Sequence, residues 1–546
     1  MKGIYNLKSK GLKVNNSPQK FNEDAINYEN DFWSIVSQGF FLNEIELKEK
    51  YHVSDTFELL LCLINETDGE ISRLLYGSYV IVAFDKIRQR LIICNDLLSK
   101  HSLYYAIIRD TGMNEEVLIF SDSYFETIDQ ANKLGAKLTI DLLGIKMMNR
   151  HRIFYDDITY LKEVKFLKPY KWIDVIDNDV IVKGINIPKE DDRIEAENII
   201  TKCNQLFEKA VKEQYHKNVN YGYKQVVTLS GGMDSRTTFL YGLKAGYKNQ
   251  ICYTYAEADS MDFQIAQSIA DNEGCQFFFH SITNGNFLMK RNEIAEENEG
   301  QMVYGGATGT YESICMYDTS QWGIVHTGIG GGEIMGDLCV ADEQKGWKRF
   351  EDSLDCTEQE RERLKFMRSE YDGYNQFSNL NDIRRCLNSQ KTAQRFCEYM
   401  SPFLYEPFFN WMLTIPYEIK KERKLYLKWL EKYCKTNYPS TFKFGAKKDS
   451  KMNYYLRRCI NYISNKSGRK TIYDMNPYQY WEKTNIELVN KLTELYETDL
   501  NELMGKIDND IVKVIQEDWD IANINKKINI LTTTWALCKF VNLDKS

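Results

Sequence analysis

The chain has 546 residues, of which 27% are charged, with a formal net charge of −8 and a pI near 5.6. This length indicates two or more domains, and the acidic balance argues against a nucleic-acid protein held by phosphate contacts. Thirteen cysteines without a C-x-x-C pair, together with apolar runs too short to span a bilayer, predict a cytoplasmic protein with reduced thiols and no membrane partner.

Short apolar runs separated by polar turns dominate the first hundred or so residues. Residues 78–85 and 90–94 are apolar runs on either side of the polar turn 86–89, which is a hairpin signal, and residues 103–106 resume the strand pattern. The sequence therefore predicts an N-terminal domain built on a mixed sheet.

A helix, a strand and a second helix follow in the middle of the chain. Apolar residues at three- and four-residue spacings predict a helix over residues 199–211 whose apolar face serves core packing. Residues 225–229 predict a buried parallel strand, and residues 236–244 predict a helix closed by Gly246.

The turn between this strand and helix is the strongest functional signal in the chain. Its sequence is Ser230-Gly231-Gly232-Met233-Asp234-Ser235. Two adjacent glycines let backbone N–H groups approach an anion closely, and the helix N-terminus adds partial positive charge. We therefore predict a phosphate-binding loop, distinct from the Walker pattern because no Gly-Lys-Ser/Thr follows. An ordinary strand-to-helix turn is the alternative.

The strand and helix pattern then repeats. Residues 250–256 and 276–280 are apolar runs, and residues 261–272 have helical periodicity. This alternation predicts a parallel sheet with helices on both faces, with ligands at the carboxyl ends of its strands. A plain N-cap explains Ser260 or Asp262 as well as a ligand contact does.

Three more stretches stand out towards the C-terminus. Residues 325–336 form a second glycine-rich segment, and residues 304–312 form a third, for which we expect a surface loop. Residues 443–448 are rich in lysine, with a solvated basic loop as the alternative to a functional role. Residues 530–541 predict a packed terminal helix.

Several of these motifs resemble those of asparagine synthetases. The turn at 230–235 resembles their pyrophosphate loop, residues 325–336 resemble Ser-Gly-x-Gly-Ser-Asp-Glu-x-x-Gly, and residues 397–405 resemble Val-Glu-Ala-Arg-x-Pro-Phe-Leu-Asp. Short pieces of the N-terminal part, such as Gly77-Ser78-Tyr79, resemble the glutaminase domain of the same enzymes. The resemblance extends from Gly3 to about Lys448.

The resemblance implies two domains. Residues 1–188 are expected to form an α+β domain with the sandwich of N-terminal-nucleophile amidotransferases. Residues 189–546 are expected to form an α/β parallel-sheet ATP-pyrophosphatase domain with a helical C-terminal half.

The N-terminal domain is expected to lack glutaminase activity. Its nucleophile position, a cysteine in the family, is occupied by Lys2, whose protonated amine cannot replace a thiolate. Residues 54–56 resemble the loop that holds the glutamine amino group, and the resemblance places Gln38-Gly39 where the family has its Asn-Gly oxyanion pair. β-Lactam synthetases and lasso-peptide cyclases share the loss of the cysteine.

The resemblance also implies the site. ATP would bind to Leu229, Ser230, Gly231, Gly232, Asp234, Ser235, Tyr255, Thr327 and Gly328, and Mg²⁺ to Asp234. Gly332 stands where the family has a second metal-binding aspartate, with Glu333 the nearest replacement and Asp337 a weaker one. Lys447, Lys443 and Glu398 are the expected catalytic residues. Ile329 occupies an acid-base position and cannot transfer a proton.

These expectations combine into an ATP-dependent amide ligase that adenylates a small-molecule or peptide carboxylate and couples it to an amine without glutamine. A lasso-peptide cyclase or β-lactam synthetase is the nearest type. A degenerate nucleotide- or partner-binding protein and an ammonia-dependent asparagine synthetase remain alternatives. A homodimer or a pathway partner also remains open.

Overall fold

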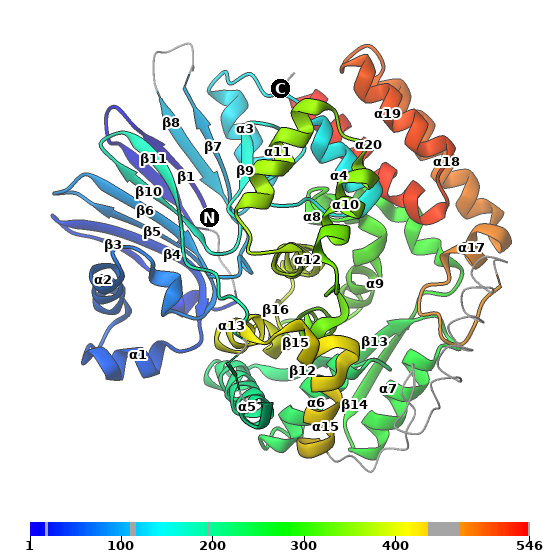
Figure 1. The fold of residues 1–546 in the computed structure, drawn as a ribbon, viewed down its shortest axis with the longest axis horizontal. Helices are drawn as coiled ribbons and strands as arrows, with labels where there is room; N and C mark the ends of the chain where they lie inside the picture. The colour runs from blue at the N-terminus through cyan, green and yellow to red at the C-terminus, as the bar shows by residue number, and fades with distance from the viewer. Residues whose placement is uncertain (17–19, 110–115, 192, 195, 435–468, 544–546) are drawn as a thin grey trace.

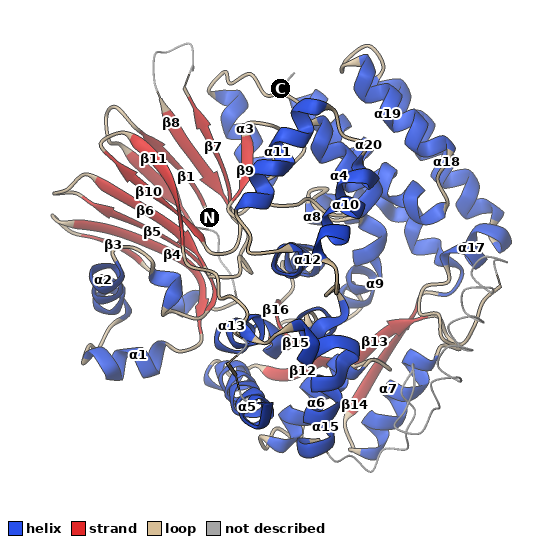
Figure 2. Cartoon of the chain, viewed as in Figure 1, coloured by secondary structure: helices blue, strands red, loops and turns tan. Residues whose placement is uncertain are grey.

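The computed structural model describes residues 1–16, 20–109, 116–191, 193–194, 196–434 and 469–543. Antiparallel sheets make up most of its N-terminal part, a parallel sheet lies in the middle of the sequence, and helices dominate the rest (Figures 1 and 2). None of the helices in these ranges is long and apolar enough to cross a lipid bilayer.

Two sheets form the N-terminal part. Within the described residues their strand orders are β2-β1-β8-β7-β9 and β11-β10-β6-β5-β4-β3, and the paired strands are antiparallel. The strands are β1 (Lys2–Asn6), β2 (Leu12–Asn15), β3 (Asn27–Glu29), β4 (Trp33–Phe41), β5 (Gly77–Asp85), β6 (Arg90–Asn95), β7 (Tyr104–Ile108), β8 (Val117–Ser121), β9 (Val164–Phe166), β10 (Lys171–Ile176) and β11 (Asp179–Gly184).

An apolar layer joins these two sheets. Tyr5 and Leu118 from the first sheet pack in one buried cluster with Val82 and Ile173 from the second. The predicted hairpin is confirmed, since β5 and β6 pair directly. The helices of this part are α1 (Glu44–Tyr51), α2 (Thr56–Thr67), α3 (Tyr124–Lys133) and α4 (Leu142–His151).

The parallel sheet follows the sequence expectation. Its strand order is β14-β13-β12-β15-β16 in the described part of the chain, and each neighbouring pair is parallel. Its strands are β12 (Lys224–Thr228), β13 (Ile251–Ala256), β14 (Gln276–Ser281), β15 (Trp322–His326) and β16 (Glu398–Met400). The helices near it in sequence are α5 (Ala196–Asn220), α6 (Met233–Lys244) and α7 (Met261–Asn272). Helix α7 begins and ends where the sequence predicted.

The glycine-rich stretch 304–312 was expected as a loop, and this was wrong. It belongs to helix α9 (Tyr304–Cys315). Close packing explains the difference, because a Cβ on Gly305 would lie 2.6 Å from the side chain of Ile528 on helix α20 (Ile524–Leu543). Glycine therefore permits a close helix contact here instead of a flexible loop.

The remaining helices lie after β14 in the sequence, either between the last strands of the parallel sheet or beyond β16. They are α8 (Arg291–Asn298), α10 (Glu343–Leu354), α11 (Glu358–Ser369), α12 (Tyr374–Lys391), α13 (Glu406–Thr414), α14 (Tyr417–Lys420), α15 (Lys424–Tyr433), α17 (Tyr478–Thr484), α18 (Ile486–Leu503) and α19 (Asn509–Asp520). The predicted terminal helix is confirmed in α20, whose Asn529 side chain donates to the carbonyl of Asn149 on α4 over 3.0 Å.

The N-terminal sheets and the later part of the chain share buried contacts. Two of the main hydrophobic clusters contain residues from both. Lys100 forms a buried 2.6 Å ion pair with Glu406, and Glu299 accepts hydrogen bonds from the backbone N–H groups of Tyr124 and Phe125 at the start of α3. The two parts are thus joined by apolar packing and buried charge pairs.

Candidate nucleotide-binding site

The predicted phosphate loop lies between β12 and α6. The helix begins at Met233, three residues earlier than expected, because Gly232 takes the N-cap position with an extended backbone. A glycine cap has no side chain to bind the first-turn N–H groups, and no side-chain cap hydrogen bond is present. The positive end of the α6 dipole is therefore at the carboxyl end of a central strand.

The N–H groups within the loop bind side-chain oxygens. Ser230 N–H donates to Ser235 Oγ over 3.1 Å, Gly231 N–H to Asp262 Oδ1 over 3.2 Å, and Gly232 N–H to Ser230 Oγ over 3.1 Å. A phosphate at these groups would have to displace these oxygens. Asp262 thus contacts the loop, whereas Ser260 caps α7 by accepting from Phe263.

The second glycine-rich turn lies beside this loop. It follows β15, which is paired with β12, so both turns leave the sheet at the same edge. Thr327 is buried, its N–H donates to the Met400 carbonyl over 2.8 Å, and its carbonyl accepts from Thr238 Oγ1 on α6. A Cβ on Gly328 would collide with the backbone of Asp234 and Ser235, so glycine is required where the two turns touch.

Asp234 is the point where the two turns converge. Its Oδ2 accepts a 3.1 Å hydrogen bond from the N–H of Gly332, and a Cβ on Gly331 would lie 2.7 Å from its Cγ. Burial, with a smaller contribution from the nearby Asp337 carboxylate, raises the pKa of Asp234 to about 6, although Tyr426 and Arg423 act in the opposite direction. Sequence reasoning missed Tyr426 and Arg423, because both come from α15 and the turn before it.

Asp337 lies next to the space that a side chain at position 332 would fill. A Cβ on Gly332 would be 2.8 Å from Asp337 Oδ2 and 3.5 Å from Asp234 Oδ2. Asp337 also accepts a 2.6 Å hydrogen bond from Nε of Arg423. Two carboxylates and one guanidinium group therefore meet beside the glycine-rich turn.

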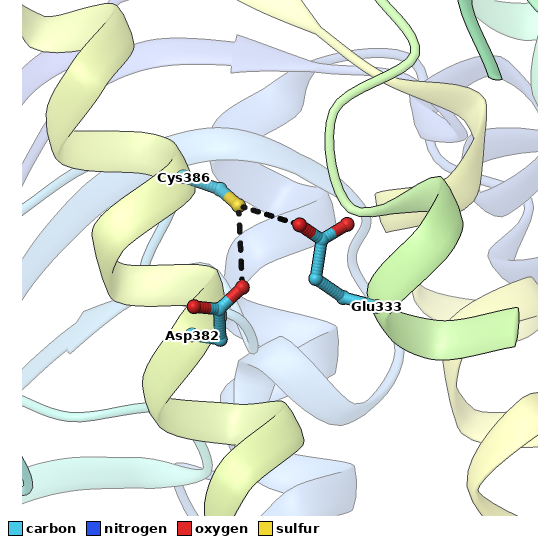
Figure 3. Close-up of side chains that lie close together, drawn as sticks. All are labelled: Glu333, Asp382 and Cys386. Carbon is cyan, nitrogen blue, oxygen red and sulfur yellow. Dashed lines mark hydrogen bonds between the residues drawn. The ribbon is translucent and has the colours of Figure 1, made fainter. Parts of the chain in front are cut away.

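Glu333 faces helix α12. Figure 3 shows its carboxylate pointing toward Asp382 and Cys386, and the three ligand atoms lie within 4.8 Å of one another. Arg385 donates to Asp382 over 2.6 Å and to Glu333 over 3.3 Å, so a cation already neutralises these groups. Burial raises the pKa of the Cys386 thiol well above its ordinary value, which makes it a poor metal ligand. The chemistry of this donor set does not favour a metal ion.

The other predicted nucleotide residues lie along neighbouring strands. Leu229 is buried; its N–H donates to the Tyr253 carbonyl over 3.0 Å, and its carbonyl accepts from Thr254 Oγ1. Tyr255 is half-buried near the carboxyl end of β13, opposite His280 of β14. These contacts join β12 and β13 at the edge where the loop begins.

A later segment covers the end of β13. The N–H of Met261 donates to the Ile472 carbonyl over 2.7 Å, and the N–H of Glu257 donates to the Met475 carbonyl. Lys470 forms 2.8 Å ion pairs with Glu257 and with Asp259. This lysine was not expected from the sequence. The predicted catalytic lysines Lys443 and Lys447 lie outside the described residues.

Glu398 does not join the glycine-rich turns. It begins β16, two residues before Met400, whose carbonyl is at the carboxyl end of the strand. Its carboxyl group is buried, which raises its pKa, and His101 and Asp122 of the N-terminal part are its charged neighbours. This position favours a role between the two parts of the molecule.

The expected glutaminase pocket has a different arrangement. Lys2 is exposed and pairs with Glu126 over 2.7 Å, and the Phe120 ring lies across Gly3 where a Cβ would clash. Asp55 caps α2 by accepting from the Glu58 N–H, so the 54–56 segment has a structural role.

Around Asp122, the Met1 amine and Gln38 Nε2 each donate over 2.6 Å to Oδ2 of that residue. His101 Nε2 lies 3.4 Å from the same oxygen. This carboxylate is therefore surrounded by donors and lacks a nucleophile among these neighbours.

No protein-family model matches the chain, and no curated protein matches its sequence. The function of the chain must therefore be inferred from the geometry of the two turns and from the motif resemblance.

Proposed function

We propose that this chain is an ATP-dependent ligase that activates a carboxylate as an acyl-adenylate and transfers the acyl group to an amine. The observation that carries the proposal is the convergence of two glycine-rich turns on Asp234 at one edge of a parallel sheet. Ligands of open parallel sheets bind at this edge. The finer fold assignment belongs to the same proposal: an amidotransferase-like sandwich and an ATP-pyrophosphatase domain.

The loop after β12 would hold the phosphates of ATP. The first turn of α6 offers its dipole and N–H groups, and Gly231 and Gly232 allow close approach of the backbone. The hydroxyl groups of Ser230 and Ser235, now 2.9 Å apart, can turn from each other towards phosphate oxygens. Tyr255 and Leu229 would lie on the adenine side.

Asp234 and Asp337 would hold Mg²⁺. These two side chains suit the ion because Mg²⁺ prefers oxygen ligands. Both carboxylates also border the same space next to Gly332. When bound, Mg²⁺ would neutralise phosphate charge. Arg423 pairs with Asp337 here and would have to release part of that contact.

The reaction would have two steps. A carboxylate oxygen of the substrate attacks the α-phosphorus of ATP, and the bond to the β-phosphate breaks to release pyrophosphate. An amine nitrogen then attacks the acyl carbon, and AMP leaves with the electron pair of the broken C–O bond. Ile329 cannot take the amine proton. Glu333 faces α12 and pairs with Arg385, so the proton would pass to the phosphate group of the departing AMP.

Pyrophosphate–ATP exchange tests this proposal. Purified protein with Mg²⁺ and a panel of amino acids, peptides and aspartate is expected to exchange labelled pyrophosphate into ATP with at least one acid. Asp234→Ala should abolish the exchange. Asp271→Ala, which changes an exposed aspartate of α7, is the matched control and should retain it. Aspartate with ammonium in the same panel separates an asparagine synthetase from the other ligases.

A binding role without turnover is the second candidate. It is favoured by Gly332 and Ile329, which stand where the resemblance places a metal-binding aspartate and an acid-base residue. Saturable ATP binding without exchange for any acid at high Mg²⁺ would support this candidate and remove the ligase. Absence of ATP binding would contradict both.

A further inference from the structure

Arg236 lies in the first turn of α6, directly after the glycine-rich loop at residues 230–235. The residue is only 8% exposed, and its side chain turns back toward the N-terminus of the helix. Its Nε donates to the Gly232 carbonyl over 3.1 Å, and its Nη2 donates to the Gly231 carbonyl over 3.2 Å. One guanidinium group therefore joins two successive peptide carbonyls of the loop.

These two contacts determine the direction of two N–H groups. The loop peptides are trans, and in a trans peptide the C=O and N–H bonds point in opposite directions in one rigid plane. The Gly231 carbonyl shares a plane with the Gly232 N–H, and the Gly232 carbonyl shares one with the Met233 N–H. Because Arg236 holds both carbonyls, both N–H groups point away from it. The hydroxyl group of Ser230, which is proposed to bind phosphate, accepts from the first of them over 3.1 Å.

The glycine peptides need such a restraint more than other peptides do. Gly231 and Gly232 lack a Cβ, so their backbone can adopt several orientations at little cost. Asp262 restrains the first of these peptides by accepting from the Gly231 N–H over 3.2 Å. Arg236 restrains the next two. Donors that are fixed before an anion arrives need no reorganisation when it binds.

The position of this cation also favours an anion at the loop. Burial lowers the pKa of Arg236 to about 10, although its neighbours Asp234 and Asp262 act in the opposite direction, so the group stays charged at neutral pH. Positive charge near a helix N-terminus is unfavourable for the helix itself, because the positive end of the dipole lies there. A phosphate group at the loop would supply the negative charge that this helix end favours.

We propose that Arg236 is a positioning residue that orients the N–H groups of Gly232 and Met233 for pyrophosphate and for the β- and γ-phosphates of ATP. The inference rests on the proposed nucleotide site, and it applies both to the ligase and to the binding role without turnover. Arg236 acts through the backbone and does not itself touch the nucleotide. Its loss should therefore weaken the ligands that fill the loop and spare a nucleotide that lacks the pyrophosphate group.

Calorimetric titration of the full chain with inorganic pyrophosphate, ATP and AMP, each with Mg²⁺, tests this role. Arg236→Met removes both carbonyl contacts and should weaken the binding of pyrophosphate and ATP by about tenfold. AMP should bind with an unchanged Kd. Arg236→Lys keeps the charge, but one ammonium group does not reproduce the two fixed N–H directions of a guanidinium edge, so it should recover only part of the loss.

Arg384→Met is the matched control. Arg384 of α12 is 3% exposed, its Nη1 donates to the Asp156 carbonyl over 3.0 Å, and burial lowers its pKa to about 10. It thus shares burial and a carbonyl contact with Arg236 but contacts the N-terminal part of the chain. Its replacement should leave all three affinities unchanged. Thermal unfolding shows whether each variant is folded at the temperature of the titration.

The outcomes separate this role from the proposed function. Wild-type affinity of Arg236→Met for pyrophosphate and ATP would overturn the role of Arg236 and leave the nucleotide site intact. Wild-type affinity of Arg236→Lys would overturn it as well, because charge alone would then be sufficient. An equal loss of AMP binding in Arg236→Met would contradict an effect limited to the loop. Absence of binding of all three ligands by the wild type would overturn both this role and the nucleotide-binding function.

Discussion

The N–H of Gly332 donates a 3.1 Å hydrogen bond to Oδ2 of Asp234. The turn after β15 therefore fixes the carboxylate of the loop after β12. The space beside Gly332 is taken by Asp337, whose Oδ2 would lie 2.8 Å from a Cβ at that position. The carboxylate of Asp337, five residues after Gly332 in the sequence, therefore lies beside that of Asp234.

The first prediction concerns this second carboxylate. Asp337→Asn should weaken the Mg²⁺ or Mn²⁺ dependence of ATP binding by about tenfold, because one of two anionic ligands is lost. Gly332→Asp should restore it when combined with Asp337→Ala, since that replacement frees the space for a side chain. Mn²⁺ paramagnetic resonance and calorimetry with ATP measure metal binding without turnover.

The control for this series is Glu422→Gln, which neutralises an exposed carboxylate near Lys424. It should leave metal affinity unchanged. If wild-type protein binds Mn²⁺–ATP and Asp337→Asn binds it equally well, Asp337 has no role in metal binding, and this result does not decide between the ligase and the binding role.

The second prediction is a pH dependence caused by Asp234. Its pKa is raised from 3.8 to about 6, so ionisation of this group opposes folding. The cost is absent below pH 4, grows between pH 4 and pH 6, and is constant above pH 6, where it reaches about 3 kcal/mol. Asp234→Asn should therefore be more stable than wild type at pH 7 and equal to it at pH 4, as measured by urea denaturation. Equal gains at both pH values would contradict this assignment.

Local signals in the sequence predicted the elements around the site well. Helix α7 was predicted at its observed bounds because Ser260 caps its first turn, and β12 and β13 were recognised as apolar runs. The two elements that were predicted wrongly depend on where a glycine allows a helix to begin or to pack. The start of α6 moved to Met233 since Gly232 can take the cap, and α9 formed because Gly305 fits against Ile528.

The long-range part of the site could not be read from the sequence. Arg423 reaches Asp337 across 86 residues, and its backbone is left-handed with a φ of 60°. No periodicity marks such a residue. The catalytic role of Glu398 stays a prediction, since the motif around it matches while its side chain lies near His101 and Asp122 of the N-terminal part.

The third prediction concerns the buried pair between the two parts of the chain. Glu406→Gln leaves the Lys100 ammonium buried without its partner at 2.6 Å, so it should lower the free energy of unfolding by about 3 kcal/mol. The double variant Lys100→Met, Glu406→Leu should recover most of this loss. Lys133→Met removes an exposed pair and should change the free energy of unfolding far less than Glu406→Gln does. Chemical denaturation measures all three, and a loss for Glu406→Gln no larger than that of the exposed control would contradict the role of this pair.

The last prediction is that the protein releases no glutamate from glutamine. Lys2 directs its amine to Glu126, and Phe120 fills the space over Gly3, so neither a nucleophile nor room for the amide is present at this end of β1. Glutamate formation can be followed with glutamate dehydrogenase. It should equal that of a protein-free blank from about pH 6 to about pH 9, the range in which the thiol of a cysteine-dependent glutaminase would ionise. Asp122→Ala should leave that baseline unchanged, although it removes the acceptor of the Met1 amine and of Gln38. Glutamate release above the blank that disappears in Asp122→Ala would show that this cluster retains hydrolytic activity.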